Sequence, residues 1–193
     1  MYQSRWTKKP MIHVFPHWNW ENGNTVNVWL YSNCDKVELF VNGVSKGIKT
    51  KNNIGSKYNY EYNVSYEAGT LLAKGMDSEG NVLVQEEIKT SSTPYKISLT
   101  SDKSLIKQGG DDLIFVECNV LDENDIVCRT ANNLINFSVS GGTIVGTDNG
   151  DATDVSTSLR SPNRKLFSGK ALCVVKPDNT DTDVVITATS DGL

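Results

Sequence analysis

The chain has 193 residues, of which 38% are hydrophobic and 22% are charged, a composition typical of an ordinary globular protein. Its formal net charge is −4, and neither half carries the basic stripe that neutralises phosphate groups, so nucleic acid is not expected as a partner. No apolar run approaches the roughly 18 to 20 residues that cross a bilayer, so a membrane partner is not expected either.

Alternation of apolar and polar residues, rather than helical periodicity, dominates the first half of the chain. In residues 26–31, for example, every second residue is Val or Leu. Asn42-Gly43 is a strong signal for a two-residue β-hairpin turn, because both residues tolerate the positive φ that this turn needs. The pattern predicts strands at residues 26–31, 37–41, 44–49, 58–64, 71–77 and 82–88.

A polar linker rich in Ser and Thr and ending at Pro94 separates this half from the rest. After it, strands are predicted at residues 96–101, 113–121, 134–139, 143–145, 170–175 and 184–189, with turns between them that include residues 108–111. Short alternating strands at this spacing predict an all-β fold of two tandem immunoglobulin-like antiparallel β-sandwiches. We place the first sandwich at residues 11–91 and the second at residues 94–193.

The acidic residues do not form an obvious catalytic pair. A glycosidase needs two carboxyl groups facing each other across a cleft. Here they fall in expected turns (Asp122, Glu123, Asp125, Asp148, Asp151, Asp154) or on the polar side of expected strands (Glu38, Glu61, Glu86). His13 and His17 flank Pro16, so they cannot share a helix face as zinc-protease histidines do. We favour packed, hydrogen-bonded histidines, with a small site at this pair as the alternative.

Residues 148–154 have the composition of a calcium-binding loop. Gly150 stands at the third position, where an EF-hand needs an oxygen ligand, and no glutamate follows at the twelfth position. A turn held by side-chain-to-backbone hydrogen bonds explains the same residues, and we favour it over calcium. We therefore predict no metal ion and no cofactor.

The four cysteines show no zinc-ligand spacing. Cys118 and Cys173 fall on two expected core strands, where a disulfide between strands is one alternative. We favour buried free thiols, because free cysteine behaves as a small apolar residue.

Residues 13–31 hold three of the four tryptophans and both histidines. Trp18 and Trp20 are two positions apart, so in an extended segment both project to the same side. Such a pair either stacks on a sugar, as in many carbohydrate-binding modules, or lies against a neighbouring domain. Pro16 makes this segment stiff, which favours docking.

Two long strings in the first half carry a family resemblance. YQSRWTKKPMIHVFPHWNW, followed by VNVWLYSNCDKVELFVNGVSKG, is similar to the C-terminal region of bacterial glycoside hydrolase family 2 enzymes of the β-galactosidase type. The second half resembles the immunoglobulin-like sandwich that follows there, in the strings GGDDLIFVECNVLDEN, ANNLINFSVSG, GTDNGDATD and ITATSDGL. The resemblance implies that residues 1–10 are the end of the last helix of a catalytic (β/α)8 barrel and a linker.

The same resemblance implies what the chain does. In this family the acid/base and nucleophile glutamates lie in the barrel, and nothing here matches them, so no catalytic residue is assigned. The expected role is that of accessory domains whose partner is the barrel, with Trp6, His17, Trp18 and Trp20 as candidate contact residues. Away from that partner, Trp6, Trp18 and Trp20 should be exposed.

Two other functions stay open from the sequence. One is a carbohydrate-binding module that uses Trp18 and Trp20, or Tyr58, Tyr60 and Tyr62, as its platform. The other is a bacterial immunoglobulin-like spacer or adhesin pair, which fold alone does not exclude. The compartment is also open, whether periplasmic, extracellular or cytoplasmic.

Overall fold

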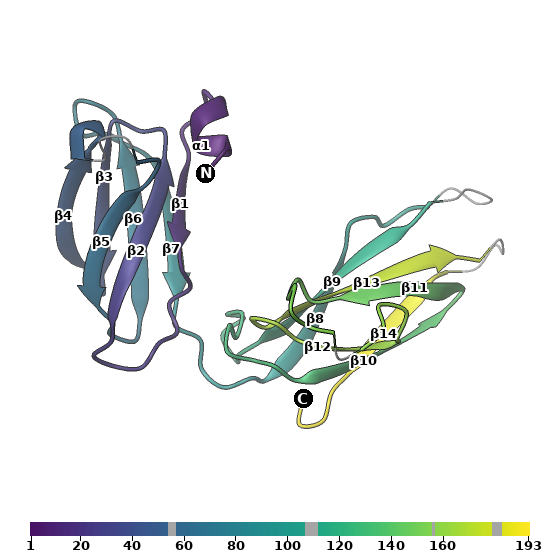
Figure 1. Ribbon diagram of the computed structural model, residues 1–193. Coiled ribbons are helices and arrows are strands. Elements are labelled where there is room, and N and C mark those ends of the chain that lie inside the picture. The colour runs from purple at the N-terminus through teal and green to yellow at the C-terminus, as the bar shows by residue number, and fades with distance from the viewer. Residues whose placement is uncertain (54–56, 107–111, 156, 179–182) are drawn as a thin grey trace. The chain divides into compact units, whose positions relative to one another are not determined.

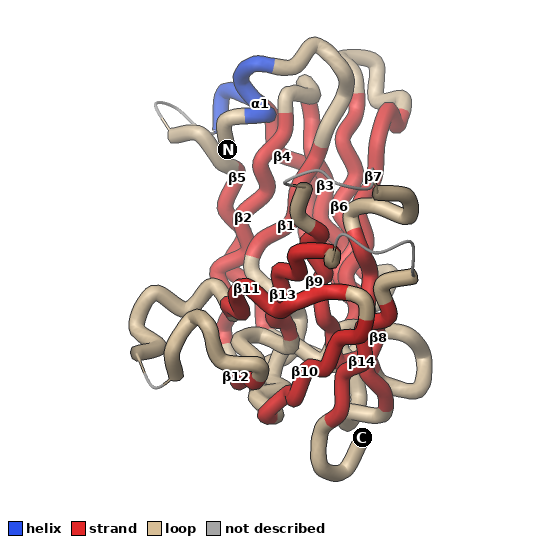
Figure 2. Tube along the Cα trace, turned by 90° about the vertical axis from the view of Figure 1, so that its right-hand side faces the viewer, coloured by secondary structure: helices blue, strands red, loops and turns tan. Residues whose placement is uncertain are grey.

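The computed structural model describes residues 1–53, 57–106, 112–155, 157–178 and 183–193, and it divides into two compact units, Met1–Thr90 and Ser91–Leu193 (Figure 1). Every strand pair in the described residues is antiparallel, and the tube view shows mostly strands and loops, with a short helix near the N-terminus (Figure 2). This confirms the predicted all-β fold of two antiparallel sandwiches. None of the helices in the described residues has the length and apolar character needed to cross a membrane.

The first unit contains two sheets, with strand orders β1-β2-β5 and β4-β3-β6-β7. Its elements are α1 (Gln3–Trp6), β1 (Ile12–Phe15), β2 (Thr25–Ser32), β3 (Lys36–Val41), β4 (Val44–Thr50), the 3-10 turn η1 (Lys51–Asn53), β5 (Tyr60–Ser65), β6 (Thr70–Met76) and β7 (Val82–Lys89). In β2 the predicted alternation holds, since Val26, Val28 and Leu30 are buried. They form one core with the inward residues of β3 and β6, such as Leu39 and Leu71.

The turn between β3 and β4 has the predicted conformation. Asn42 and Gly43 have φ values of 49° and 80°, so both lie in the left-handed region that a tight hairpin requires. The Asn42 side chain also accepts a hydrogen bond from the backbone N–H of Thr70, at 2.8 Å. This turn therefore fixes the register of β3 against β4 and is tied to the start of β6.

Strand β1 was not anticipated, because its residues belonged to the aromatic segment that we interpreted as a docking strip. It pairs with β2, with Ile12 opposite Ser32 and Phe15 opposite Trp29. The carboxylate of Glu86 in β7 accepts a hydrogen bond from the backbone N–H of Val14 at 2.9 Å, so β1 also reaches the edge of the other sheet. Ile12 and Val14 are buried, whereas His13 and Phe15 point outward.

The second unit has strand orders β12-β10-β14 and β11-β13-β9-β8. Its strands are β8 (Lys96–Ser101), β9 (Ile114–Leu121), β10 (Leu134–Ser140), β11 (Gly142–Asp148), β12 (Asn163–Lys165), β13 (Lys170–Pro177) and β14 (Val185–Thr189). Six of these match predicted strands, and the three-residue β12 is too short to give an alternating signal. The turn predicted at residues 108–111 lies outside the described residues.

The cysteines are core residues. All four, each within the described residues, are buried free thiols, which for Cys118 and Cys173 is the alternative that we favoured. Burial raises the pKa of Cys118 to about 12 and that of Cys173 to about 11. Both thiols therefore stay protonated at neutral pH and pack as small apolar groups.

Candidate docking and carbohydrate-binding surfaces

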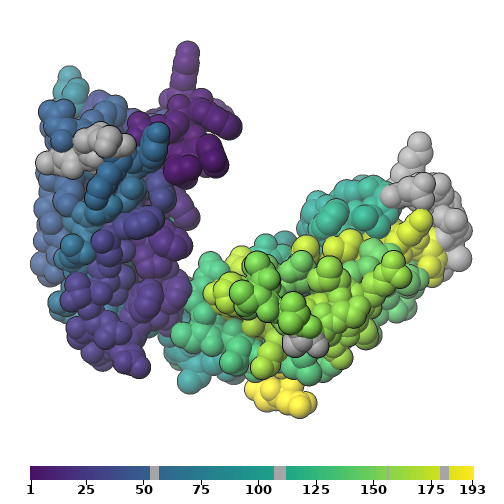
Figure 3. Space-filling view, in the orientation of Figure 1, coloured from purple at the N-terminus to yellow at the C-terminus, as the bar shows by residue number. Residues whose placement is uncertain are grey.

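The N-terminal helical turn holds two aromatic rings in solvent. Tyr2 and Trp6 are 65% and 80% exposed, and their ring centroids lie 5.4 Å apart. Arg5 fastens the turn to the unit, because its guanidinium group lies 4.9 Å from the centre of the Tyr58 ring and donates a hydrogen bond to the Lys57 carbonyl. The first residues of the chain stand out from one end of this unit (Figure 3). Trp6 is therefore available for contact with another domain.

Asn33 fixes the segment that connects this turn to β1. Its amide nitrogen donates hydrogen bonds to the carbonyl oxygens of Thr7 and Lys9, at 3.1 and 2.8 Å. Its side-chain oxygen accepts a bond from the backbone N–H of Met11, at 2.9 Å. One side chain between β2 and β3 thus holds three residues of the connection. These bonds fix the position of Trp6 relative to the rest of the first unit.

The expectation that Trp18 is exposed beside Trp20 is wrong. Trp18 is 1% exposed, its indole N–H donates a hydrogen bond to the carbonyl oxygen of Glu67 at 3.1 Å, and its ring meets that of Tyr66 edge-on. The segment after Pro16 turns instead of running extended, so residues two apart do not share a side. Trp18 belongs to the core of its own unit and cannot serve as a sugar platform or docking contact.

Trp20 is the exposed member of the pair. It is 42% exposed, and the imidazole of His17 stacks on it, with ring centroids 4.9 Å apart and an interplanar angle of 13°. The indole N–H of Trp20 donates a hydrogen bond to the carbonyl oxygen of His17, at 2.9 Å. His17 in turn accepts a bond at Nδ1 from the backbone N–H of Asn19. The half-buried His17 is thus a packed residue that holds the Trp20 ring in place.

A cavity of about 300 Å³ borders this ring. It is lined by Pro16, Trp20, Asn24, Thr25, Val26 and Asn27. The buried Val26 belongs to the core, while Thr25 and Asn27 alternate with it on the outward face of β2. The cavity therefore combines one aromatic ring with several small polar side chains.

Sequence reasoning missed a second aromatic contact on the outer face of the same sheet. Phe15 and Trp29 pair across β1 and β2, with ring centroids 6.1 Å apart, and they are 53% and 37% exposed. The alternation in residues 26–31 already put Trp29 on the outward side. What was missing was a strand at residues 12–15, without which Phe15 had no assigned neighbour.

The tyrosines of residues 58–64 do not form a surface platform. Tyr60 and Tyr62 are buried in β5, and the Tyr62 hydroxyl donates to the backbone, with the Val37 and Gly47 carbonyl oxygens at 3.2 and 3.1 Å. Burial raises the pKa of both phenols. Only Tyr58, which precedes the strand, is exposed among these three.

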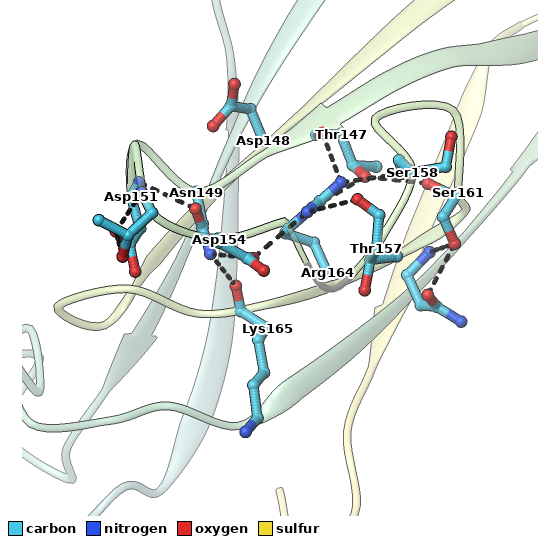
Figure 4. Close-up of polar contacts among 12 residues, drawn as sticks. Thr147, Asp148, Asn149, Asp151, Asp154, Thr157, Ser158, Ser161, Arg164 and Lys165 are labelled. Atoms are coloured by element: carbon cyan, nitrogen blue, oxygen red, sulfur yellow. Dashed lines mark hydrogen bonds and ion pairs between the residues drawn. The ribbon is translucent and has the colours of Figure 1, made fainter.

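The loop at residues 148–154 is organised around an arginine that the sequence did not single out. Arg164 of β12 is 1% exposed and pairs with the carboxylate of Asp154, at 3.3 Å. Its guanidinium group also donates hydrogen bonds to the carbonyl oxygens of Thr147 and Ser158, at 3.1 and 2.9 Å (Figure 4).

The remaining polar groups of this loop form the expected turn. The Asn149 amide donates hydrogen bonds to the Asp154 carboxylate and to the Lys165 carbonyl, at 2.9 and 3.0 Å. Asp148 and Asp151 accept bonds from nearby backbone N–H groups. Among the described residues, no group of three or more His, Cys, Asp or Glu side chains is arranged to hold a metal ion. The carboxylate of Asp154 is therefore the ion-pair partner of Arg164 in this structure.

Residues 43–47, Gly-Val-Ser-Lys-Gly, match the letters of the Gly-x-Ser-x-Gly nucleophile motif. That motif needs a sharp turn between a strand and a helix. Here Ser45 lies in the β3–β4 hairpin, and its hydroxyl donates a hydrogen bond to the carboxylate of Glu38, at 2.6 Å. The match carries no nucleophile geometry.

Among the described residues, the carboxyl groups of Glu61, Asp77, Asp112, Glu117 and Asp122 have a pKa below the ordinary value. The main cause of the lowered pKa is a hydrogen bond from a lysine in three of them: from Lys57 to Glu61, from Lys103 to Asp112 and from Lys170 to Glu117. For Asp77, the main cause is a hydrogen bond from the side chain of Asn81. For Asp122, burial opposes ionisation, but bonds from the N–H groups of Ser92, Ile126 and Asn124 outweigh it. A general acid of a glycosidase needs the opposite shift, toward a raised pKa.

Comparison with known proteins places these two sandwiches in one family. "Glycoside hydrolase family 2 C-terminal domain 5" matches residues 97–193, and a domain of unknown function, DUF4982, matches residues 23–84. The chain belongs to glycoside hydrolase family 2, as a pair of the C-terminal domains found in its enzymes. This confirms the resemblance seen in the sequence.

Individual relatives cover both sandwiches. The β-galactosidase BoGH2A of Bacteroides ovatus is 42% identical over 195 residues, a match that covers 100% of this chain and 22% of that protein. A β-glycosidase from Bacteroides vulgatus has a TM-score of 0.89 at 34% identity, covering 98% of this chain and 24% of that one. A glycosyl hydrolase family 2 member from Bacteroides cellulosilyticus has a TM-score of 0.90 at 27% identity, covering 98% and 28%. The chain thus spans about a fifth of the length of the curated relative.

Proposed function

We propose that this chain is a non-catalytic accessory module of a β-galactosidase-like retaining glycoside hydrolase and packs against the catalytic barrel of that enzyme. The observation that carries the proposal is the match to BoGH2A, which includes the whole of this chain but only 22% of the relative. The remainder of such an enzyme has room for the barrel. The lowered pKa values of Glu61, Asp112 and Glu117 add support, because these carboxylates are engaged by lysines and poorly suited to donate protons.

We propose that this chain contacts the barrel through Tyr2 and Trp6, and we call these two residues the N-terminal aromatic pair. Trp6 is the most exposed aromatic side chain among the described residues, and aromatic residues are enriched in the cores of protein interfaces. Arg5 and Asn33 hold the pair in position before any partner arrives. Preorganisation of this kind lowers the entropy lost when two domains associate.

A chimeric enzyme tests this proposal. The region of BoGH2A that matches this chain is deleted, and the chain is fused in its place. We expect the deletion to lower the thermal stability and β-galactosidase activity of the relative, and the fusion to restore most of both. Trp6→Ala in the fused chain should reduce the restoration, because it removes most of the exposed ring area of the pair.

Trp20→Ala is the matched control, because β1 runs away from α1 (Figure 1) and Trp20 follows the end of β1 in the sequence. We expect the control to restore stability as well as the unchanged chain does. Two results would contradict the proposal. One is a fusion no more stable or active than the deletion; the other is glycoside turnover by this chain alone, free of contaminating enzyme.

A further inference from the structure

We propose that the cavity beside Trp20 is a binding site for one neutral sugar ring, separate from the proposed docking role of the N-terminal aromatic pair. The site consists of the six lining residues named above, and we call it the Trp20 cavity. Its volume of about 300 Å³ lies at the small end of ligand-binding sites, which span roughly 300–1,000 Å³. That size suits one pyranose rather than a long segment of glycan.

The Trp20 ring is held ready for stacking. His17 covers part of the indole at a nearly parallel angle of 13°, and the N–H of the indole is bonded to the His17 carbonyl. These two contacts fix the plane of the ring while it remains 42% exposed. An apolar face of a sugar ring can therefore pack on the indole with little loss of side-chain entropy.

Polar partners for sugar hydroxyls stand around this ring. The side chains of Asn24 and Asn27 are exposed, and within the described part of the chain their amides form no hydrogen bond, so their donors and acceptors are free for a ligand. Each amide can donate and accept, as each hydroxyl of a sugar can. Asn27 also lies on β2 opposite Asn63 of β5, and this pairing keeps its backbone rigid.

The charge of the site limits the ligand. None of the six lining residues is charged, so a carboxylate on the sugar would lose hydration without gaining an ionic partner. The Trp20 cavity should therefore prefer a neutral hexopyranoside to a glycuronide.

Nuclear magnetic resonance of the ¹⁵N-labelled chain tests the site, because the indole N–H signals of the four tryptophans report separately. The probes are methyl β-galactopyranoside, methyl β-glucopyranoside and the methyl β-glucuronide. We expect a neutral probe to shift the Trp20 indole and the Asn27 side-chain amide in a saturable way. A dissociation constant of about 1 mM is typical of weak contacts of this size, so the titration extends to about 20 mM.

Variants separate the site from the rest of the surface. Trp20→Ala and Asn27→Ala should each weaken binding by about tenfold or more. Trp6→Ala should leave it unchanged. The buried Trp18 indole signal shows that each variant is folded, and if Trp20→Ala loses that signal, Asn27→Ala alone decides.

Three results would overturn the proposal. The first is the absence of any saturable shift with both neutral probes. The second is binding that persists in folded Trp20→Ala or Asn27→Ala protein. The third is a glucuronide affinity equal to that of the neutral probes. None of these results bears on docking, which Trp6→Ala in the chimera tests separately.

Discussion

At the scale of single residues, Trp18 and Trp20 show how far identical side chains can diverge within three positions. Trp18→Ala should lower the free energy of unfolding of the first unit by about 3–5 kcal/mol, because it removes a fully buried ring and opens a cavity. Trp20→Ala should cost no more than about 1 kcal/mol, because its ring is partly exposed. Urea unfolding of both variants measures the difference, and equal losses would show that Trp18 is not a core residue.

Asp122 gives the second unit a pH dependence. This residue is 1% exposed, and its two carboxylate oxygens accept bonds from the N–H groups of Ser92, Asn124 and Ile126 at 2.8–2.9 Å. Because the pKa is lowered in the folded state, the stabilisation is complete above the unfolded pKa of about 3.9. It is lost as the pH falls through the lower, folded-state value.

Asp122→Asn should therefore destabilise the second unit by about 2–3 kcal/mol at neutral pH, since an amide N–H would face backbone donors. The variant should also lose less stability than the unchanged protein between about pH 5 and pH 2. Thermal unfolding at a series of pH values provides the measurement. Parallel pH curves for the two proteins would be evidence against an ionised Asp122 in this role.

At the scale of elements, the β-turns decide where strands end, and Gly169 offers a sharp test. Its φ is +75°, and a Cβ at this position would lie 2.3 Å from the carbonyl oxygen of Cys128. Gly150, in the same unit, has a φ of +77° but nothing within 4 Å of its Cβ position. The two sites share a backbone conformation and differ in the space available.

Gly150→Ala should cost about 1–2 kcal/mol from the left-handed conformation alone. Gly169→Ala should cost that amount plus about 1–3 kcal/mol, because backbone atoms must shift to admit the methyl group. Denaturant unfolding of the two variants compares them directly. If both are equally stable, the close approach of Gly169 to Cys128 does not exist in solution.

The elements also show what the sequence could and could not predict. Long alternating strands such as β2 and β9 were predicted because every second residue had to be apolar to form the core. β1 and β12, with four and three residues, are set by pairing with β2 and β10, and local alternation does not reveal such tertiary contacts. The burial of Trp18 was missed for a related reason, because it depends on a bend in the backbone after Pro16 and not on the spacing of residues in the sequence.

The Arg164 cluster was hidden for another physical reason. Arginine is almost never fully buried unless its donors are paired. The partners of Arg164 are largely backbone carbonyl oxygens, at Thr147 and Ser158, and carbonyl oxygens leave no signature in side-chain composition. The acidic loop could be recognised in the sequence, but the pairing of Asp154 with Arg164 could not.

At the scale of the whole molecule, each unit has its own hydrophobic core. The first core is centred on β2, β3 and β6, and the second on β9, β10 and β13. The boundary between Thr90 and Ser91 also separates two sets of bonds, since Thr90 donates to the Trp18 carbonyl and Ser92 donates to Asp122.

Residues 1–90 and 91–193, produced as separate proteins, should therefore each fold. Dispersed amide spectra and a cooperative thermal transition for each fragment are the expected results. The Asp122→Asn change provides the control, because it should destabilise only the second fragment. A fragment that remains unfolded would mean that its core is incomplete without the other unit.

The central claim, that the N-terminal aromatic pair docks on a catalytic barrel, is tested most directly by oxidative footprinting of tryptophans with mass spectrometry. The chain alone is compared with the same chain fused into the truncated BoGH2A enzyme. We predict that Trp6 is strongly oxidised in the chain alone and protected in the fusion, while Trp18 is protected and Trp20 is oxidised in both. Equal oxidation of Trp6 in the two proteins would contradict the account.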